Sequence, residues 1–98
     1  MAYRLTFSSR AVREMGAAQA WDESQSTGLG EEFVVAIELQ LIRLQQEPLL
    51  YAEVIPKVRR ALAPRFPYGL FYTIKGDLIH VLAVIHESRH PDLWPKSR

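Results

Sequence analysis

The chain opens with alternating apolar and polar residues and then changes to a helical period. Residues 3–7 alternate strictly, which predicts a strand. A serine at position 8 or 9 is expected to cap a first helix over residues 10–24, because its hydroxyl accepts a hydrogen bond from a free amide of the first turn. The buried face of this helix is expected to carry four residues, Ala11, Met15, Ala18 and Trp21.

A turn at residues 25–30 separates this helix from a second one, expected over residues 31–46. The second helix repeats apolar residues at helical spacing: Phe33, Ile37, Leu41 and Leu44. Four more apolar residues widen this stripe, namely Val34, Val35, Leu39 and Ile42. We therefore expect the helix to be largely buried. Pro48 ends it, so the two helices are expected to form an antiparallel hairpin.

The second half of the chain has the pattern of three strands in a meander. A strand with basic residues is expected over residues 54–63, followed by a rigid connection at 64–69. Two further strands, 70–75 and 78–86, are joined by Gly76-Asp77. In the last strand, one face is expected to carry Ile79, Val81, Ala83 and Ile85, and the other Leu82 and Val84. The order β-α-α-β-β-β predicts an α+β fold in one domain, residues 1–98, with helices on one sheet face and a polar tail at 87–98.

Composition narrows the possible functions. The chain has 98 residues, a net charge of +1 and no cysteine, which excludes a disulfide scaffold and any cysteine-ligated metal. Residues 1–50 hold four basic and seven acidic side chains, whereas residues 51–98 hold eight basic and four acidic ones. An anionic partner is therefore expected to meet the second half. The longest apolar stretch, residues 78–85, is too short to span a membrane, so we expect no membrane association.

Two motifs invite readings that we reject. Gly28-Leu29-Gly30 lacks the third glycine of a dinucleotide site and the lysine of a phosphate loop, so it predicts a plain interhelix turn. Residues 86–90 spell H-E-x-x-H, which binds zinc only on a helix. Here His86 ends a strand pattern and Pro91 follows His90, so the two imidazoles would lie about 13 Å apart in an extended chain. We expect no metal site and no cofactor.

Arginines and aromatic residues alternate in the second half. Guanidinium groups bind phosphates and aromatic faces accept bases, so this set predicts contacts with an anionic or acidic partner. The candidates are Arg59, Arg60, Arg65, Tyr68, Arg89, Trp94 and Arg98. The alternative is a solvated strand face, with aromatic residues such as Phe66 and Tyr72 in the core. His86 could be a general acid or base, or a strand-end histidine that bonds the backbone of the tail.

Several segments, in this order, resemble the RelE/ParE toxin superfamily of bacterial type II toxin–antitoxin systems, often called plasmid stabilisation proteins. They are residues 28–33, 46–48, Arg60, 65–72 and 81–91, with Trp94 and Arg98. The resemblance covers nearly the whole chain. It implies two helices packed on a small twisted antiparallel sheet. It also implies a cytoplasmic toxin that inhibits growth and that a cognate antitoxin wraps and neutralises in a hetero-oligomer.

The superfamily divides by target. ParE-like toxins inhibit DNA gyrase by binding, whereas RelE-like toxins cut messenger RNA in the ribosome. For cleavage, the resemblance would assign catalytic roles to Arg65, His86 and Arg89. RNA-cutting members usually carry several catalytic lysines or a Glu–His pair, and a tyrosine near the C-terminus, but this chain has no tyrosine after Tyr72. We therefore favour a ParE-like gyrase inhibitor without bond chemistry of its own. A RelE-like endoribonuclease is the alternative, and an inert member that binds only its antitoxin is a third reading.

Overall fold

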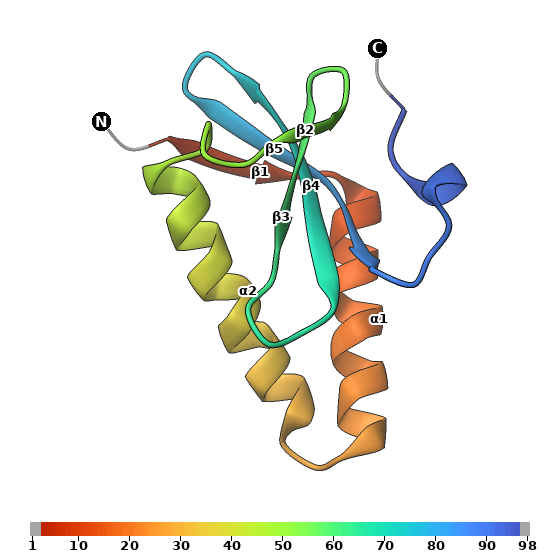
Figure 1. Cartoon of the computed structure of the whole chain (residues 1–98). Coiled ribbons are helices and arrows are strands. Elements are labelled where there is room, and N and C mark those ends of the chain that lie inside the picture. The colour runs from red at the N-terminus through yellow and green to blue at the C-terminus, as the bar shows by residue number, and fades with distance from the viewer. Residues whose placement is uncertain (1–2, 97–98) are drawn as a thin grey trace.

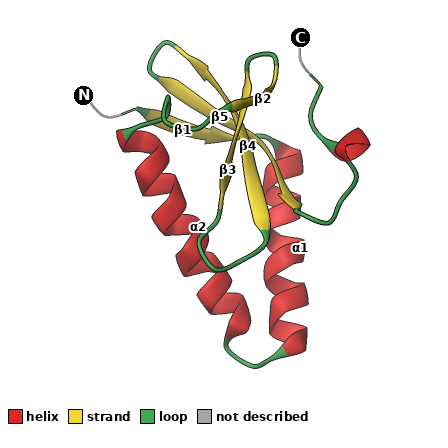
Figure 2. Cartoon of the chain, viewed as in Figure 1, coloured by secondary structure: helices red, strands yellow, loops and turns green. Residues whose placement is uncertain are grey.

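The computed structural model describes residues 3–96 and forms two layers, a helical hairpin and a five-stranded sheet (Figures 1 and 2). The elements follow one another as β1 (Arg4–Phe7), α1 (Ser9–Gln25), α2 (Leu29–Gln46), β2 (Glu53–Ile55), β3 (Val58–Leu62), β4 (Tyr68–Lys75), β5 (Leu78–His86) and a short 3₁₀ helix, η1 (Pro91–Leu93). The predicted fold class, two helices packed on a small sheet, is confirmed. No helix within residues 3–96 is both long enough and apolar enough to cross a membrane.

Local capping explains where the helices begin. The Ser8 hydroxyl accepts from the amide of Ala11 at 3.0 Å, as the sequence predicts. Gly28, which has a φ of 90°, is the N-cap residue of α2. The Glu23 carboxylate accepts hydrogen bonds from the amides of Gly28 and Gly30, at 3.0 Å each. The chain therefore places its own anion at the N-terminus of α2, where the free amides and the helix dipole favour negative charge. The interhelix turn is therefore shorter than expected: it comprises residues 26–28, and Leu29 and Gly30 already lie in the first turn of α2.

The strand order is β1-β5-β4-β3-β2, and its β1–β5 pair corrects the expectation of an antiparallel sheet. β1 lies parallel to β5, with Leu5 opposite Ile79 and Phe7 opposite Val81. The other neighbouring strands pair antiparallel, so the sheet is mixed. The alternation of a short strand carries no information about its direction. The long path from β1 through both helices and three strands supplies the crossover that a parallel pair needs.

The strand expected over residues 54–63 is wrong in one respect, because a turn divides it into β2 and β3. Lys57 adopts a left-handed φ of 66° in this turn, and its amide donates to the Glu53 carboxylate at 3.0 Å. Pro56, just before it, has no amide hydrogen to contribute to a strand ladder. A proline followed by a left-handed residue ends one strand and starts the next.

A β-bulge at Leu82 corrects the predicted faces of the last strand. Tyr72 lies opposite Val81 and Phe71 opposite Ala83, so Leu82 is an extra residue in β5. The extra residue reverses the alternation, because side chains point to opposite faces with a period of two. Ile79, Val81 and Val84 therefore face the helices, whereas Ala83 and Ile85 join a second cluster on the opposite face.

The helices are less buried than their apolar content predicts. On α2, Val35, Leu39 and Ile42 are 48%, 52% and 52% exposed, so the expectation of a largely buried helix is wrong. One sheet face and one neighbouring helix cover only about half of a helix surface. On α1, Trp21 is 61% exposed and Asp22 is buried. Trp21 lies about 60° around the helix from Ala18, which takes the indole off the face that packs on the sheet.

Candidate functional site

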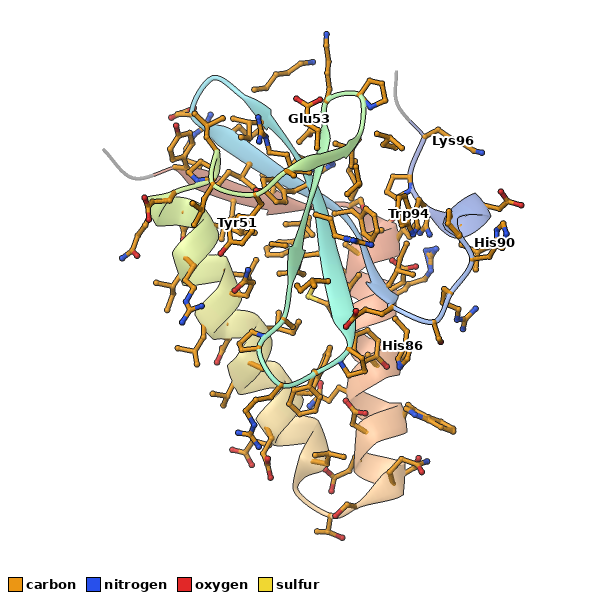
Figure 3. All side chains as sticks on the ribbon, in the orientation of Figure 1. Tyr51, Glu53, His86, His90, Trp94 and Lys96 are labelled. Carbon is orange, nitrogen blue, oxygen red and sulfur yellow. The ribbon has the colours of Figure 1, made fainter. Side chains whose placement is uncertain are left out.

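The C-terminal tail folds back over the sheet face that the helices leave open, and it brings two candidate residues together. Trp94 points from the tail toward the sheet (Figure 3), with its ring centroid 5.2 Å from that of Phe71. The Arg60 guanidinium carbon lies 5.2 Å from the Trp94 ring centroid, a cation–π contact. Val58, Phe71, Ala83 and Ile85 form the buried cluster against which Trp94 packs. Trp94 is therefore packed as part of the fold, and the Arg60 guanidinium lies over its ring.

Arg59 lies on the face of β3 that looks toward the helices. Its guanidinium donates to the backbone carbonyls of Tyr51 and Leu49 and forms an ion pair with Glu53 at 3.7 Å. These contacts fix the segment between α2 and β2 to the sheet. The guanidinium is thus occupied within the chain, although the sequence marked it as a candidate contact for a partner.

Arg65 lies apart from the other candidates, in the loop between β3 and β4. It has a left-handed φ of 70°, and its side chain, 76% exposed, forms an ion pair with Glu32 of α2 at 3.2 Å. The next residue, Phe66, anchors the loop through an edge-on contact with Phe33, with ring centroids 5.6 Å apart. The loop therefore directs Arg65 toward α2.

A groove of about 640 Å³ runs between α1, the end of β5 and the tail, and we name it the α1–β5 groove. Three candidate residues line it: Tyr68, His86 and Arg89. Trp21 lines it from α1. The structure thus brings together two of the three residues considered for RNA cleavage, His86 and Arg89, and places Arg65 outside this groove.

His86 is held at the rim of the α1–β5 groove by local contacts. Its Nδ1 accepts from the amide of Ser88 at 3.0 Å and lies 2.8 Å from the Ser88 hydroxyl. Its ring meets Tyr68 edge-on, with centroids 5.1 Å apart. These contacts match the second of the two sequence readings, a strand-end histidine that bonds the backbone of the tail. Within the described residues, 3–96, no hydrogen bond involves the other ring nitrogen, Nε2.

Asp22 is a buried carboxylate beside this groove that sequence reasoning missed. Burial raises its pKa, and the nearby charge of His86 acts in the opposite direction. Within residues 3–96 its Oδ2 has no hydrogen-bond partner. Burial also raises the pKa of Tyr68, as does the charge of Asp22, while Arg89 lowers it. The sequence did contain a signal that Asp22 is buried: its spacing from Ala11 and Ala18 places all three residues on one helical face.

Arg10 and Glu14 connect α1 to β5 and to the tail. Arg10 forms an ion pair with Glu14 at 3.0 Å and donates to the carbonyl of Leu93. Glu14 accepts from the amide of Val84 at 2.9 Å, just beyond the stretch of β5 that pairs with β1. The four-residue spacing of Arg10 and Glu14 is visible in the sequence, but their contacts to β5 and η1 depend on the fold.

A second groove, of about 850 Å³, lies between the β2–β3 and β4–β5 hairpins, and we name it the hairpin groove. Its lining includes the apolar Val58 and Leu82. Exposed lysines from three separate segments line it: Lys57, Lys75 and Lys96. Sequence reasoning emphasised arginines and missed this set, because only the fold brings the two turns and the tail together.

Arg98 and the H-E-x-x-H residues are the remaining positions that the sequence singled out. Arg98 lies outside the described residues. His86 ends β5 and His90 caps η1, where its Nδ1 accepts from the amide of Asp92 at 3.1 Å. The residues of the H-E-x-x-H sequence therefore lie on a strand end and a turn rather than on a helix.

Comparisons with known proteins were made for sequence and for structure. Residues 5–91 match the family model described as ParE toxin of the type II toxin–antitoxin system parDE. No curated protein sequence matches the chain. A chromosomal ParDE toxin–antitoxin system from P. aeruginosa is 21% identical, with a TM-score of 0.69 over 86% of this chain and 95% of the other. The intact E. coli RelBE complex is 18% identical, with a TM-score of 0.64 over 90% of this chain and 100% of the other. The Mycobacterium tuberculosis RelBE2 complex is 20% identical, with a TM-score of 0.63 over 88% and 99%. At these identities the structural matches establish a shared fold.

Proposed function

The chain belongs to the ParE toxin family of type II toxin–antitoxin systems, within the RelE/ParE superfamily, and we propose that it inhibits DNA gyrase by binding and is neutralised by a cognate antitoxin. The family match, which extends over residues 5–91, carries this proposal. The toxin would act in the cytoplasm, where gyrase and its DNA are found.

The positions of the candidate catalytic residues support binding over RNA cleavage. Cleavage requires one group to activate the 2′-hydroxyl and others to stabilise the phosphate and protonate the leaving oxygen at the same point. His86 and Arg89 share the α1–β5 groove, but the Arg65 guanidinium is paired with Glu32 on α2. The Nδ1 of His86 is also occupied by Ser88. Arg65 is thus separated from the two other residues, and the three do not converge on one point.

One observation favours the alternative, a RelE-like ribosome-dependent endoribonuclease. The hairpin groove gathers Lys57, Lys75 and Lys96 together with His80 and Glu53. Lysines stabilise phosphate charge, and a histidine is a usual proton donor or acceptor. If the chain cuts RNA, we expect the hairpin groove to hold the cleaved phosphate.

The antitoxin partner is supported by the charge and shape of the same groove. Its cationic rim and apolar lining suit an extended acidic segment that also carries apolar side chains. An antitoxin that fills this groove would cover the basic half of the chain and form a hetero-oligomer with the toxin. Covering these lysines would then block a target that binds the hairpin groove.

A gyrase supercoiling assay with the purified chain tests the proposal. We expect inhibition at micromolar protein. Arg89→Ala should weaken inhibition about fivefold, the effect of losing about 1 kcal/mol at an interface. Arg13→Ala is the matched control, since Arg13 is an exposed arginine on α1 that lines neither groove. A gyrase that remains fully active, together with cleavage of ribosome-bound message that is lost in Lys75→Ala, would replace this proposal with the endoribonuclease.

A further inference from the structure

The hairpin groove carries positive charge that the chain itself does not neutralise. Its lining holds one carboxylate, Glu53, and four basic side chains: Lys57, Arg59, Lys75 and Lys96. Glu53 is paired with Arg59 at 3.7 Å, whereas no ion pair within residues 3–96 involves any of the three lysines. All three lysines are exposed. The groove therefore offers three uncompensated cations to a partner.

The register of the sheet brings two of these lysines to the same end of the molecule. Arg59 lies opposite Tyr72 in the β3–β4 pair, and continuing this register carries Lys57, in the turn before β3, to the level of Lys75 at the end of β4. Neighbouring strands are about 4.8 Å apart. The nearest carboxylate along the chain from Lys75, that of Asp77, is already paired with Arg4 at 3.1 Å. The two lysines thus lie on adjacent hairpins, and the chain's own acids are paired elsewhere.

Polar side chains form a row across the sheet beside the lysines. Thr73 and His80 line the groove and lie opposite each other in the β4–β5 pair, and His80 lies opposite Thr6 in β1. The Nδ1 atom of His80 is 2.7 Å from the Thr6 hydroxyl. Threonine hydroxyls and lysine ammonium groups are both usual donors to phosphate oxygens in protein–DNA complexes. The groove therefore combines positive charge with a hydrogen-bond donor.

The lining of the groove indicates which form of nucleic acid it suits. Single strands are held mainly by stacking of their bases on aromatic side chains. Among residues 3–96, the lining includes no Trp, Tyr or Phe, and its imidazole, His80, is bonded to Thr6. In a duplex the bases are already stacked on each other, so a protein reaches the phosphates without having to stack on a base. A lysine acts as a point charge and reads no base sequence at a phosphate. The groove thus favours the backbone of a duplex.

From this combination we propose that the hairpin groove binds the phosphate backbone of duplex DNA through Lys57, Lys75 and Lys96, without base recognition. The inference rests on the proposed function for its setting: gyrase carries a DNA duplex, and the toxin would hold the enzyme–DNA complex at the DNA as well as at the protein. An acidic antitoxin segment in the same groove would compete with DNA for these lysines.

Fluorescence anisotropy with the full chain and a labelled duplex, in the absence of gyrase, tests the site. Three phosphate contacts predict a slope of log K against log salt of about −2.7, so affinity for a duplex of about 20 base pairs should fall about 40-fold between about 50 and 200 mM salt. Lys57→Gln and Lys75→Gln should each reduce the slope by about 0.9. Arg43→Gln is the matched control, because Arg43 is an exposed cation of α2 that forms no ion pair within residues 3–96 and lines neither groove. This control should leave the slope unchanged.

The outcomes separate this inference from the proposed function. No binding of the duplex at low salt, or a slope that Lys57→Gln and Lys75→Gln leave unchanged, would overturn the DNA site. Tighter binding of a single-stranded RNA of equal length, lost in the same variants, would assign the groove to RNA instead. Circular dichroism establishes that each variant is folded.

A supercoiling assay tests the other level. If the wild-type chain binds the duplex as expected but leaves gyrase fully active, the proposed function fails and the DNA site stands. If the double variant Lys57→Gln/Lys75→Gln no longer binds DNA but inhibits gyrase as strongly as the wild-type chain, the toxin does not hold the complex through DNA. That second result would contradict the inference and leave the proposed function intact.

Discussion

Replacing Trp94 with alanine should destabilise the whole domain, although Trp94 lies near the end of the chain. The substitution removes a ring contact with Phe71 and a cation–π contact with Arg60. Truncating a fully buried tryptophan to alanine costs about 3–5 kcal/mol. Because Trp94 is only partly buried, we expect about 2 kcal/mol, which lowers Tm by about 8–16 °C in a domain of this size.

Trp21→Ala is the matched control for this prediction. Trp21 is 61% exposed, so its truncation should change the free energy of unfolding by less than about 0.5 kcal/mol. Urea unfolding followed by far-UV circular dichroism compares the two variants without relying on the fluorophore that each one loses. If Trp94→Ala costs no more than Trp21→Ala, the tail does not pack on the sheet, and Trp94 becomes a free contact for partners.

Three further changes test the packing. Tyr72→Phe should cost about 1–2 kcal/mol by urea unfolding, because the buried hydroxyl donates to the Pro48 carbonyl at 2.6 Å and its loss leaves that carbonyl unsatisfied. Gly30→Ala should cost about 1–3 kcal/mol, since its Cβ would lie 2.7 Å from the backbone of α1. Gly16→Ala, with open space around it, should instead raise stability by about 0.5–1 kcal/mol. Equal changes in the free energy of unfolding for the two variants would contradict the close helix contact. Asp22→Asn should raise Tm at pH 7. Burial raises the pKa of Asp22 in the folded state above its unfolded value, so the wild-type chain loses stability as pH rises through the folded pKa, and the uncharged amide avoids this loss. This advantage should vanish in Tm measurements below about pH 3.8, where the carboxyl is protonated in both states, and an advantage independent of pH would contradict the role of the charge.

Local features of the fold could be predicted from the sequence because they depend on neighbouring residues. The cap at Ser8, the end of α2 near Pro48 and the turn at Gly76 each follow from the chemistry of a few adjacent positions. The helical hairpin on one face of the sheet also follows, since neither element can bury its apolar face alone. The bulge at Leu82 depends on pairing with β4, so the alternation of β5 by itself could not reveal it.

The candidate site was harder to predict, because its residues come from distant segments. Alternation of arginines and aromatics picked out Arg60 and Trp94, which the fold does bring into contact. The same pattern could not show that Arg59 is occupied by backbone carbonyls. The lysines of the hairpin groove come from two turns and the tail, so no sequence spacing joins them. Charge balance places the excess of cations in the second half of the chain, but only the fold shows which of them, within residues 3–96, form no ion pair there.

The central claim is tested most directly by the topology of plasmid DNA in bacterial cells shortly after the chain is expressed without an antitoxin. A gyrase inhibitor should stop growth and relax the negative supercoiling of the plasmid. Co-expression of the antitoxin should prevent both effects. Growth arrest with normal supercoiling, accompanied by cleavage of messages within ribosomes, would contradict the account.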